Sequence, residues 1–371
     1  MEKKMMEQQR QQAQLDFVSS GQNITVGTLE GLPMALEQLK TTTPQSDYVV
    51  ETFSSGLTAV VYHLRIGDTE WTLKQKREES LVKNIDGQTS FLNEVQRRRD
   101  ITQLKQSDPD SFKHIVDTQF ASYQDGIILS PWIEGERLHT LSGDIFQQIF
   151  SAIVSLELNG LFEWDFCPGN ILLDSKGRIK LFDFGYMYQF DPLQHFNSNG
   201  RATPLFHGIE RFETRFLFDY FLKNPSNLSA EALFDLYRVE KQCALTAYQY
   251  KLKQLLALEA DQPVIDHLEG LTLRWQRALD NNEALNELYL VESYRSSLLD
   301  LLDDLHGKSC SVYTLKKADW VLELVELHFD QLRASDAFFF GDETLEKHEL
   351  VAKFTRLRKD AEKYQLEEAV S

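Results

Sequence analysis

The sequence contains only 3 cysteines in 371 residues. Cys167, Cys243 and Cys310 do not have the spacing of a metal-binding motif, and so few cysteines are typical of a protein from a reducing cytosol. No apolar run reaches about 18 residues, so we expect no transmembrane helix. Residues 1–14 are polar and lack the apolar core of a signal peptide. These absences predict a cytoplasmic protein.

Positive charge is also scarce, because 39 Lys and Arg residues face 57 Asp and Glu residues, for a formal net charge of −18. Binding to nucleic acids depends mostly on neutralisation of phosphates by basic side chains. The only concentrated basic run, Arg97-Arg98-Arg99, lies in a predicted helix, where a solvated face is the default expectation. We therefore do not expect DNA or RNA as the main partner.

One segment combines carboxylate and amide side chains at a spacing that suits phosphoryl transfer. Asp165 is followed by Asn170, and Asp183 opens an Asp-Phe-Gly sequence further along. Transfer from ATP needs one carboxylate that orients the acceptor hydroxyl, and further oxygen ligands that hold the metal ions. The three residues are of the right types and in the right order. A simple turn around Asp183 is the alternative for the tripeptide taken alone.

The segment also predicts how these residues meet. Residues 171–174 and 179–182 are short apolar runs, and Ser-Lys-Gly between them is typical of a turn, so we expect a β-hairpin. Asn170 precedes the first strand and Asp183 follows the second, which places the two side by side. Two protein groups suffice for Mg²⁺, because waters and phosphates supply its other ligands.

This segment resembles the catalytic and metal-binding loops of the protein-kinase-like superfamily. Its Asp-x-x-Pro-Gly-Asn sequence is most similar to the bacterial small-molecule and lipopolysaccharide-core kinases, and to the aminoglycoside and choline kinases. The resemblance implies that Asp165 is the catalytic base, that Asn170 is a metal ligand and that Asp183 is the principal Mg²⁺ ligand. ATP and Mg²⁺ are the implied cofactors, with Mn²⁺ as an alternative metal.

A kinase fold requires a flexible hairpin over the phosphates, a strand lysine and a helical glutamate that pairs with it. Residues 53–62 indicate strand, turn and strand, and Ser55 and Gly56 in the turn are small enough for backbone N–H groups to approach phosphate. Lys74, in the next strand, resembles the lysine that contacts the phosphates. Glu94, in a helical pattern, is its candidate partner. An ordinary hairpin and a solvated lysine are the alternatives.

Residues 126–138 fit a strand that leads into an interdomain hinge. By the resemblance, Leu129 lies at the back of the adenine pocket. The Ser130 carbonyl and the Trp132 N–H would face the adenine edge, and Glu136 would reach the ribose.

Three departures from the family pattern separate this chain from conventional protein kinases. Glu163 stands two residues before Asp165, where the family usually has His. Cys167 occupies the position at which Ser/Thr protein kinases carry a lysine, and no convincing Ala-Pro-Glu follows Gly185. These departures argue against a protein acceptor and leave phosphotransfer itself open.

We predict an α+β, bilobal protein-kinase-like fold in four parts. These are a leader with a short helix (residues 1–46), an N-lobe with a small antiparallel sheet (47–129), a C-lobe with the catalytic and metal loops (130–225), and a long helical extension (226–371). The extension is a candidate acceptor pocket or a surface for a protein partner. Four polar residues close to the metal loop are further candidates for substrate contact: Glu210, Arg211, Glu213 and Arg215.

The leading hypothesis is an Mg²⁺·ATP-dependent phosphotransferase that acts on a hydroxyl of a sugar, a glycan or a small metabolite. A kinase-fold nucleotidyltransferase retains the same metal ligands and stays open. A non-catalytic scaffold that binds nucleotide or a protein partner also stays open. Glu163 and the sparse glycines favour the scaffold, whereas the presence of Lys74, Asp165, Asn170 and Asp183 opposes it.

Overall fold

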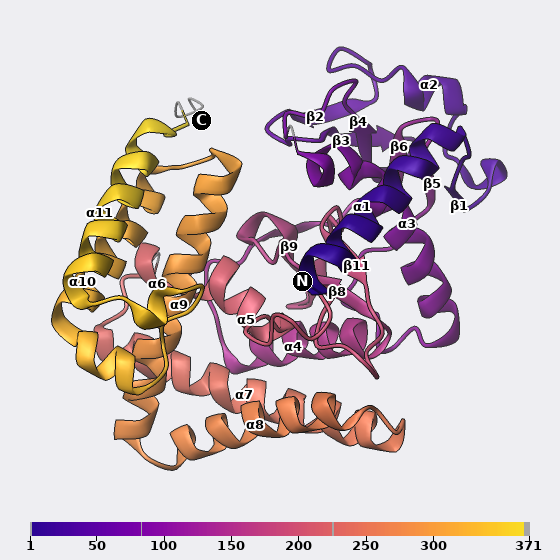
Figure 1. Cartoon of the computed structure of the whole chain (residues 1–371). Helices are drawn as coiled ribbons and strands as arrows, with labels where there is room; N and C mark the ends of the chain where they lie inside the picture. The colour runs from indigo at the N-terminus through magenta and orange to yellow at the C-terminus, as the bar shows by residue number, and fades with distance from the viewer. Residues whose placement is uncertain (1, 83, 225, 367–371) are drawn as a thin grey trace. The chain divides into compact units, whose positions relative to one another are not determined.

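The computed structural model describes residues 2–82, 84–224 and 226–366 and divides into two compact units. Unit 1 comprises Met1–Leu138, Gln147–Gly208 and Lys253–Ile265, and unit 2 comprises His139–Phe146, Ile209–Leu252 and Asp266–Ser371. Both the strand-rich N-terminal part and the expected catalytic loops fall in unit 1. Figure 1 shows the strands in the N-terminal half and the mainly helical C-terminal half, so the structure is α+β.

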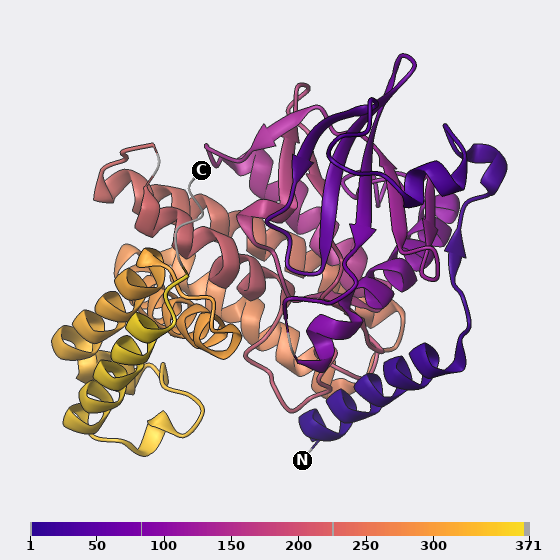
Figure 2. The ribbon, with the colours of Figure 1, turned by 90° about the horizontal axis from the view of Figure 1, so that it is seen from above.

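Unit 1 is built around a six-stranded sheet in which every pairing is antiparallel. The strand order is β1-β5-β6-β4-β3-β2, so the short strand β1 from the leader completes one edge (Figure 2). The strands are β1 (Thr25–Val26), β2 (Val49–Phe53), β3 (Ala59–Ile66), β4 (Thr69–Lys76), β5 (Phe120–Ser122) and β6 (Ile127–Pro131).

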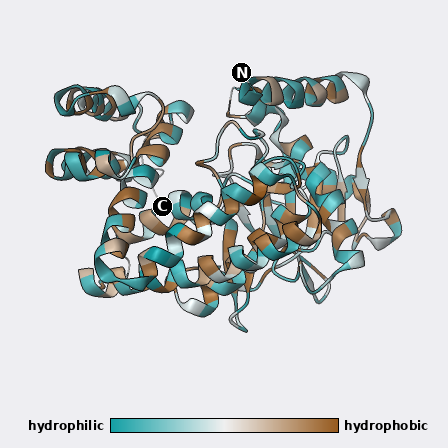
Figure 3. Ribbon diagram, turned by 60° about the horizontal axis from the view of Figure 1, so that its bottom comes forward, coloured by the Kyte–Doolittle hydropathy of each residue, from teal (hydrophilic) through white to brown (hydrophobic). Residues whose placement is uncertain are grey.

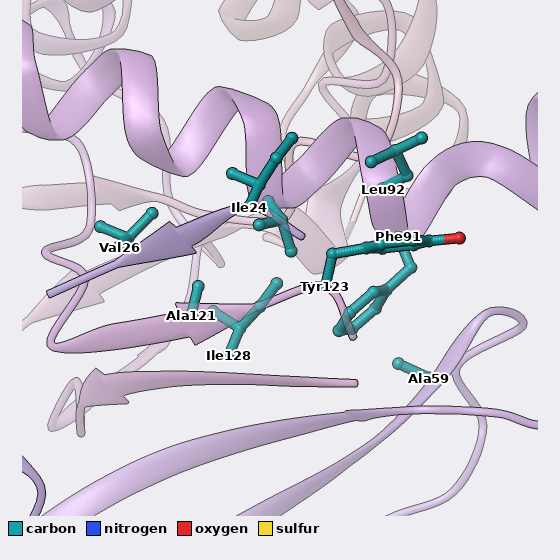
Figure 4. Close-up of a cluster of buried hydrophobic side chains, with 9 residues drawn as sticks. Ile24, Val26, Ala59, Phe91, Leu92, Ala121, Tyr123 and Ile128 are labelled. Carbon is teal, nitrogen blue, oxygen red and sulfur yellow. The ribbon is translucent and has the colours of Figure 1, made fainter. Parts of the chain in front are cut away.

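The two faces of this sheet are covered by different helices, because side chains alternate along each strand. The helix α3 (Ile85–Ser107) begins at Asn84, whose side chain accepts the N–H of Gly87. Phe91, Leu92 and Val95 of α3 pack on one face, in a buried cluster that also contains Ala59 and Ile128 (Figure 4). The other face carries a second cluster around the helix α2 (Leu36–Lys40), made of Leu39, Tyr62, Leu64, Leu73, Phe120, Ile127 and Leu129.

The β-hairpin predicted at residues 171–182 is confirmed. Strands β9 (Ile171–Asp174) and β10 (Ile179–Leu181) pair antiparallel, with Ile171 opposite Leu181. The carboxylate of Asp174 accepts the N–H groups of Lys176 and Arg178, which closes the turn, and Gly177 in that turn has a φ of +73°. The strand β7 (Gly135–Arg137) joins β9 at the far side, and β8 (Leu161–Glu163) pairs separately with β11 (Met187–Gln189).

One N-terminal helix was not expected from the sequence. The polar stretch at the start of the chain forms α1 (Glu2–Ser20), a helix whose residues are mainly hydrophilic (Figure 3). The short helix expected in the leader is present as α2.

The C-terminal half is helical, as predicted. Its helices are α4 (Gly143–Leu158), α5 (Gly208–Phe212), a π-helix (Glu213–Leu217), α6 (Phe218–Lys223), α7 (Ala230–Ala257), α8 (Gln262–Asp280), α9 (Asn282–Gly307), α10 (Val312–Ala334) and α11 (Lys347–Lys363). Three short 3-10 helices also lie among the described residues, at Leu29–Gly31, Pro168–Asn170 and Asp342–Thr344. Among the described residues, no helix is both long and apolar enough to cross a membrane.

Unit 2 contains a buried charged cluster centred on Lys241 of α7, which is 0% exposed. Its ammonium pairs with Glu213, with Glu292 at 2.6 Å and with Glu240 at 3.5 Å. Burial raises the pKa of Glu213 well above its usual range and that of Glu240 to about 7. The Lys241 charge opposes this rise, because a nearby cation favours the ionised carboxylates.

We predict that Lys241→Met destabilises the protein by about 3–5 kcal/mol, because it leaves buried carboxylates without their cation. Chemical denaturation monitored by tryptophan fluorescence would measure the loss. The control is Lys253→Met, which removes an exposed lysine from the same helix and should change stability by less than about 0.5 kcal/mol. Equal losses in the two variants would contradict a stabilising role for the cluster.

Candidate active site

Lys74 lies at the centre of a chain of ion pairs inside unit 1. It sits in β4 opposite Val61 and Ile128, so its side chain projects from the sheet face that α3 covers. The Lys74 ammonium lies 2.5 Å from a Glu94 oxygen of α3 and 2.9 Å from an Asp183 oxygen. The Lys74 and Glu94 side chains are buried. Three residues that are far apart in the sequence are thus joined through one ammonium group.

Charge balance stabilises the ionised forms of these groups. Burial opposes the charge on Lys74, but the carboxylates of Asp183 and Glu94 more than offset it, so the pKa of Lys74 lies above its usual value. Burial likewise opposes ionisation of Asp183, whereas the ion pair with Lys74 favours it and brings the pKa of Asp183 below its usual value. At neutral pH the site therefore holds the Lys74 cation next to the ionised Asp183.

The backbone of the metal loop is held in a specific conformation. Asp183 has a φ of +65°, in the left-handed region that a non-glycine residue rarely adopts. Phe184 is 2% exposed, and the Asn93 amide of α3 donates to the carbonyls of Phe184, Gly185 and Met187. Such a conformation persists only where the surroundings fix it, and Asn93 supplies that constraint.

Asp165 and Asn170 are joined through the catalytic loop. The Asn170 side-chain N–H donates to the Asp165 carbonyl at 3.0 Å, which leaves the Asn170 Oδ1 as the atom that can turn to a cation. The Asn170 carbonyl accepts the N–H of Phe182 at 3.1 Å, so Asn170 lies beside the residue that precedes Asp183. The set Asp165, Asn170 and Asp183 is therefore local, as the hairpin predicted.

Glu163 accepts a hydrogen bond from the backbone of the loop that carries Asp165. Its Oε1 accepts the N–H of Asp165 at 2.7 Å, so it fixes the backbone of the proposed base from within β8. Among the described residues, its buried Oε2 has no hydrogen-bond partner. Burial, and then the nearby charges of Asp165 and Asp183, raise the pKa of Glu163 well above its usual range. Glu163, at the position where the family usually has His, therefore still forms a hydrogen bond to the loop.

Arg98 belongs to the site, which the sequence did not indicate. The expectation of a solvated basic face is wrong for Arg97 and Arg98, which are 5% and 4% exposed, while Arg99 is exposed. Arg98 donates to Glu94 at 3.1 Å and to the Ser130 hydroxyl at 3.3 Å. Its guanidinium also lies 5.0 Å from the centre of the Phe184 ring. The spacing of four residues from Glu94 is the signal that could have revealed it.

The strand register corrects the predicted hinge by one residue. Leu129 pairs with Leu73 and packs in the cluster on the sheet face opposite to Lys74, so its predicted place at the back of the pocket is wrong. Ser130 pairs with Thr72, on the same face as Lys74. The side chain at the back of a pocket beside Lys74 is therefore that of Ser130.

The predicted use of the Trp132 N–H is also wrong in this structure. That N–H donates to the Glu70 carbonyl at 3.0 Å and extends the β4–β6 ladder. The Trp132 indole stacks on the His63 ring with 3.6 Å between the ring centres and 6° between the planes, and Phe53 stacks beyond it. Trp132 thus contributes an aromatic surface, and its backbone donor is already used.

The other residues predicted to contact the nucleotide, Ser55, Gly56 and Glu136, lie in exposed segments. Ser55 and Gly56 are in the exposed loop between β2 and β3, where Arg77 donates to the Gly56 carbonyl at 2.9 Å. A Cβ at Gly56 would approach the Ala59 carbonyl to 2.6 Å, so this turn requires glycine. Glu136 is exposed in β7 opposite Leu173, on a different sheet from Lys74.

The polar residues after the metal loop are used inside unit 2. Glu213 and Arg215 form ion pairs with Lys241 and Asp300, and Arg211 pairs with Asp303 at 3.2 Å. Glu210 is 6% exposed, and burial raises its pKa to about 7. These side chains stabilise the helical unit, so the expectation that they contact substrate is wrong for this structure.

The residues present fit a magnesium ion that is shared with phosphates. Asp183 supplies a carboxylate and Asn170 a carboxamide oxygen, which are ligand types that Mg²⁺ prefers. Among the described residues, no group of three or more His, Cys, Asp or Glu side chains is arranged to hold a metal by itself. A scan of protein-family models finds no match to this chain.

We predict that the effect of Glu163→Gln on stability depends on pH. Because the folded-state pKa of Glu163 lies above its unfolded value near 4.5, the stability that this group contributes is present below that value and is lost as pH rises through the folded pKa. The neutral amide does not titrate. The variant should therefore gain on the order of 1 kcal/mol or more over wild type between pH 5 and pH 8.

Denaturation of both proteins at the two pH values would measure this gain. Glu136→Gln, at an exposed carboxylate of the same unit, is the control. A stability difference between Glu163→Gln and wild type that is the same at both pH values would show that burial does not perturb this carboxyl group.

Proposed function

We propose that this protein is an Mg²⁺·ATP-dependent phosphotransferase with a protein-kinase-like catalytic unit. The observation that carries the proposal is the buried Lys74 ammonium between Glu94 and Asp183, close to a loop that presents Asp165 and Asn170. A structural ion pair needs only two members. A lysine held by one carboxylate and facing a second one suits the binding of phosphates and a divalent cation together.

Each residue has a distinct task in this proposal. Glu94 orients Lys74, whose ammonium contacts the phosphates of ATP. Asp183 and Asn170 hold Mg²⁺, which when bound neutralises charge on the phosphates. Asp165 orients the acceptor hydroxyl and accepts its proton as the hydroxyl oxygen bonds to the γ-phosphorus of ATP, while the bond from that phosphorus to the bridging oxygen breaks and ADP leaves. The hydrogen bond from the Asp165 N–H to Glu163 supports this role, because it fixes the backbone that carries the base.

The base of the nucleotide is proposed to lie on the sheet face that carries Lys74 and Ser130. Ser130, and not Leu129, lies on that face. The backbone groups proposed to bind the polar edge of the base are therefore the Pro131 carbonyl and the Ile133 N–H, one residue later than the sequence predicted. The stacked rings of Trp132 and His63 supply a flat aromatic surface close by. Stacking on such a surface favours a planar base.

The acceptor is proposed to be a hydroxyl of a sugar, a glycan or a small metabolite. Cys167 stands where protein kinases that act on Ser and Thr carry a lysine, which supports a non-protein acceptor. A scaffold that binds nucleotide or a protein partner is the second candidate, and Glu163 favours it, because it stands at the position where kinases usually carry His.

We predict that replacement of Asp165 lowers turnover, whereas replacement of Asp183 prevents Mg²⁺-dependent binding of ATP. Asp165→Ala should lower turnover by about 10²–10⁴-fold and leave the affinity for Mg²⁺·ATP nearly unchanged, because it removes proton transfer and acceptor orientation. Asp183→Ala should abolish Mg²⁺-dependent ATP binding. The measurement is transfer of label from γ-labelled ATP to fractions of a cell lysate, combined with equilibrium binding of the nucleotide.

Asp68→Ala, in an exposed turn of unit 1, is the matched control and should behave as wild type. Label that appears with wild type and not with Asp165→Ala would support phosphotransfer and reveal the acceptor class. Release of pyrophosphate would favour nucleotidyl transfer. ATP binding without any transfer in wild type would favour the scaffold.

A further inference from the structure

The helix α1 makes polar contacts that its composition does not require. Gln14 is 5% exposed, although the helix as a whole is hydrophilic. Its amide N–H donates to the Asn93 Oδ1 at 3.3 Å, and its carbonyl oxygen accepts the Thr89 hydroxyl at 2.9 Å. Both partners belong to α3, the helix that carries Glu94. A buried glutamine with both ends of its amide engaged is a specific contact.

Asn93 connects α1 to the metal loop. Its Nδ2 donates to the carbonyls of Phe184, Gly185 and Met187, at 3.3, 3.0 and 2.7 Å, immediately after Asp183. A side-chain amide has one oxygen and one nitrogen, so donation of the nitrogen to the loop requires the oxygen to point the other way. Gln14 supplies the donor for that oxygen, and it thereby fixes which way the Asn93 amide faces.

Arg10 provides a second connection one turn earlier in α1. Its guanidinium binds both oxygens of Asp86, at 2.8 and 3.2 Å, in the first turn of α3. The same guanidinium lies 3.6 Å from the centre of the Tyr188 ring, in β11 after the metal loop. At the start of α1, the Glu2 carboxylate accepts the N–H of Arg201 at 3.2 Å. Figure 1 shows α1 beside α3.

We infer that α1 is a clamp that positions the metal loop against α3, and that Gln14 acts through Asn93 as its positioning residue. The contacts described above support the clamp itself. Its expected effect on the binding of Mg²⁺·ATP rests on the proposed function. Since Asp183 has a left-handed backbone conformation, the loop needs external support, and the carbonyls that follow it receive that support from Asn93.

The contacts that hold α1 are few enough for α1 to be released from α3. A polar helix of this length is marginally stable in water by itself, so α1 depends on its docking contacts. These contacts are hydrogen bonds, one bidentate ion pair, a cation–π contact and one apolar contact, in which the partly buried Phe17 ring packs against Tyr123. Release of α1 would therefore leave Asn93 free to turn and the metal loop without its support.

The test is Gln14→Glu, with Gln12→Glu as the matched control. Both variants add the same charge to α1, but Gln12 is exposed and contacts only the exposed Asp16 carboxylate among its described side-chain partners. A carboxylate at position 14 still accepts from Thr89 but offers no hydrogen to Asn93 when ionised. The Asn93 amide then loses the partner that keeps its nitrogen on the loop.

The first readout is hydrogen exchange of the amides in residues 184–189, measured without nucleotide. We expect faster exchange in Gln14→Glu than in wild type and Gln12→Glu. The second readout is affinity for ATP with and without Mg²⁺. Loss of support for the ligands should weaken Mg²⁺·ATP binding by roughly tenfold or more and leave metal-free ATP binding unchanged.

The two readouts separate the clamp from the proposed function. If wild type does not bind Mg²⁺·ATP but exchange rises only in Gln14→Glu, the clamp stands and the proposed function fails. If exchange in Gln14→Glu equals that in Gln12→Glu, the clamp is overturned whatever the nucleotide does. Faster exchange with unchanged Mg²⁺·ATP affinity would overturn the positioning role of Gln14.

Discussion

The arrangement of unit 1 depends on one buried ammonium group, that of Lys74. Removing a lysine from water is costly, and two carboxylates on different elements offset that cost, one on α3 and one after β10. The position of α3 and the conformation of the metal loop are therefore linked electrostatically. Arg98 strengthens the link from the other side, because it pairs with Glu94 and lies over the ring of Phe184.

Sheet geometry decides which side chains can join this group. Alternation along the strands puts Lys74, Thr72 and Ser130 on the face that α3 covers, and puts Leu73 and Leu129 in the opposite cluster. A shift of one residue therefore changes which residue could border a nucleotide. The loops at the ends of β8 and β10 bring Asp165 and Asp183 to the same region. The side chains of Glu163 and Asn170 bond to the backbone of Asp165, and the Phe182 N–H, next to Asp183, donates to the Asn170 carbonyl.

Much of this arrangement could be predicted from local sequence. The hairpin that separates Asn170 from Asp183 follows from two apolar runs and a turn. The Lys74–Glu94 pair was implied by the resemblance to kinases, in which a strand lysine precedes a helical glutamate. The register at Leu129 could not be predicted, because Ile127, Ile128 and Leu129 are all apolar and their sequence gives no sign of which face each residue takes. The polar α1 was missed for a related reason: its docking uses hydrogen bonds of Gln14 and Arg10, which leave no hydrophobic periodicity to detect.

The most direct test of the central claim is the equilibrium binding of ATP to wild type and to Lys74→Met, each with and without Mg²⁺. If the Lys74 group binds metal and phosphates together, Mg²⁺ should raise the ATP affinity of wild type by about tenfold or more, and the variant should lose this gain. Wild-type ATP binding that Mg²⁺ does not strengthen, or that is the same in Lys74→Met, would contradict the claim and leave the ion pairs with a structural role.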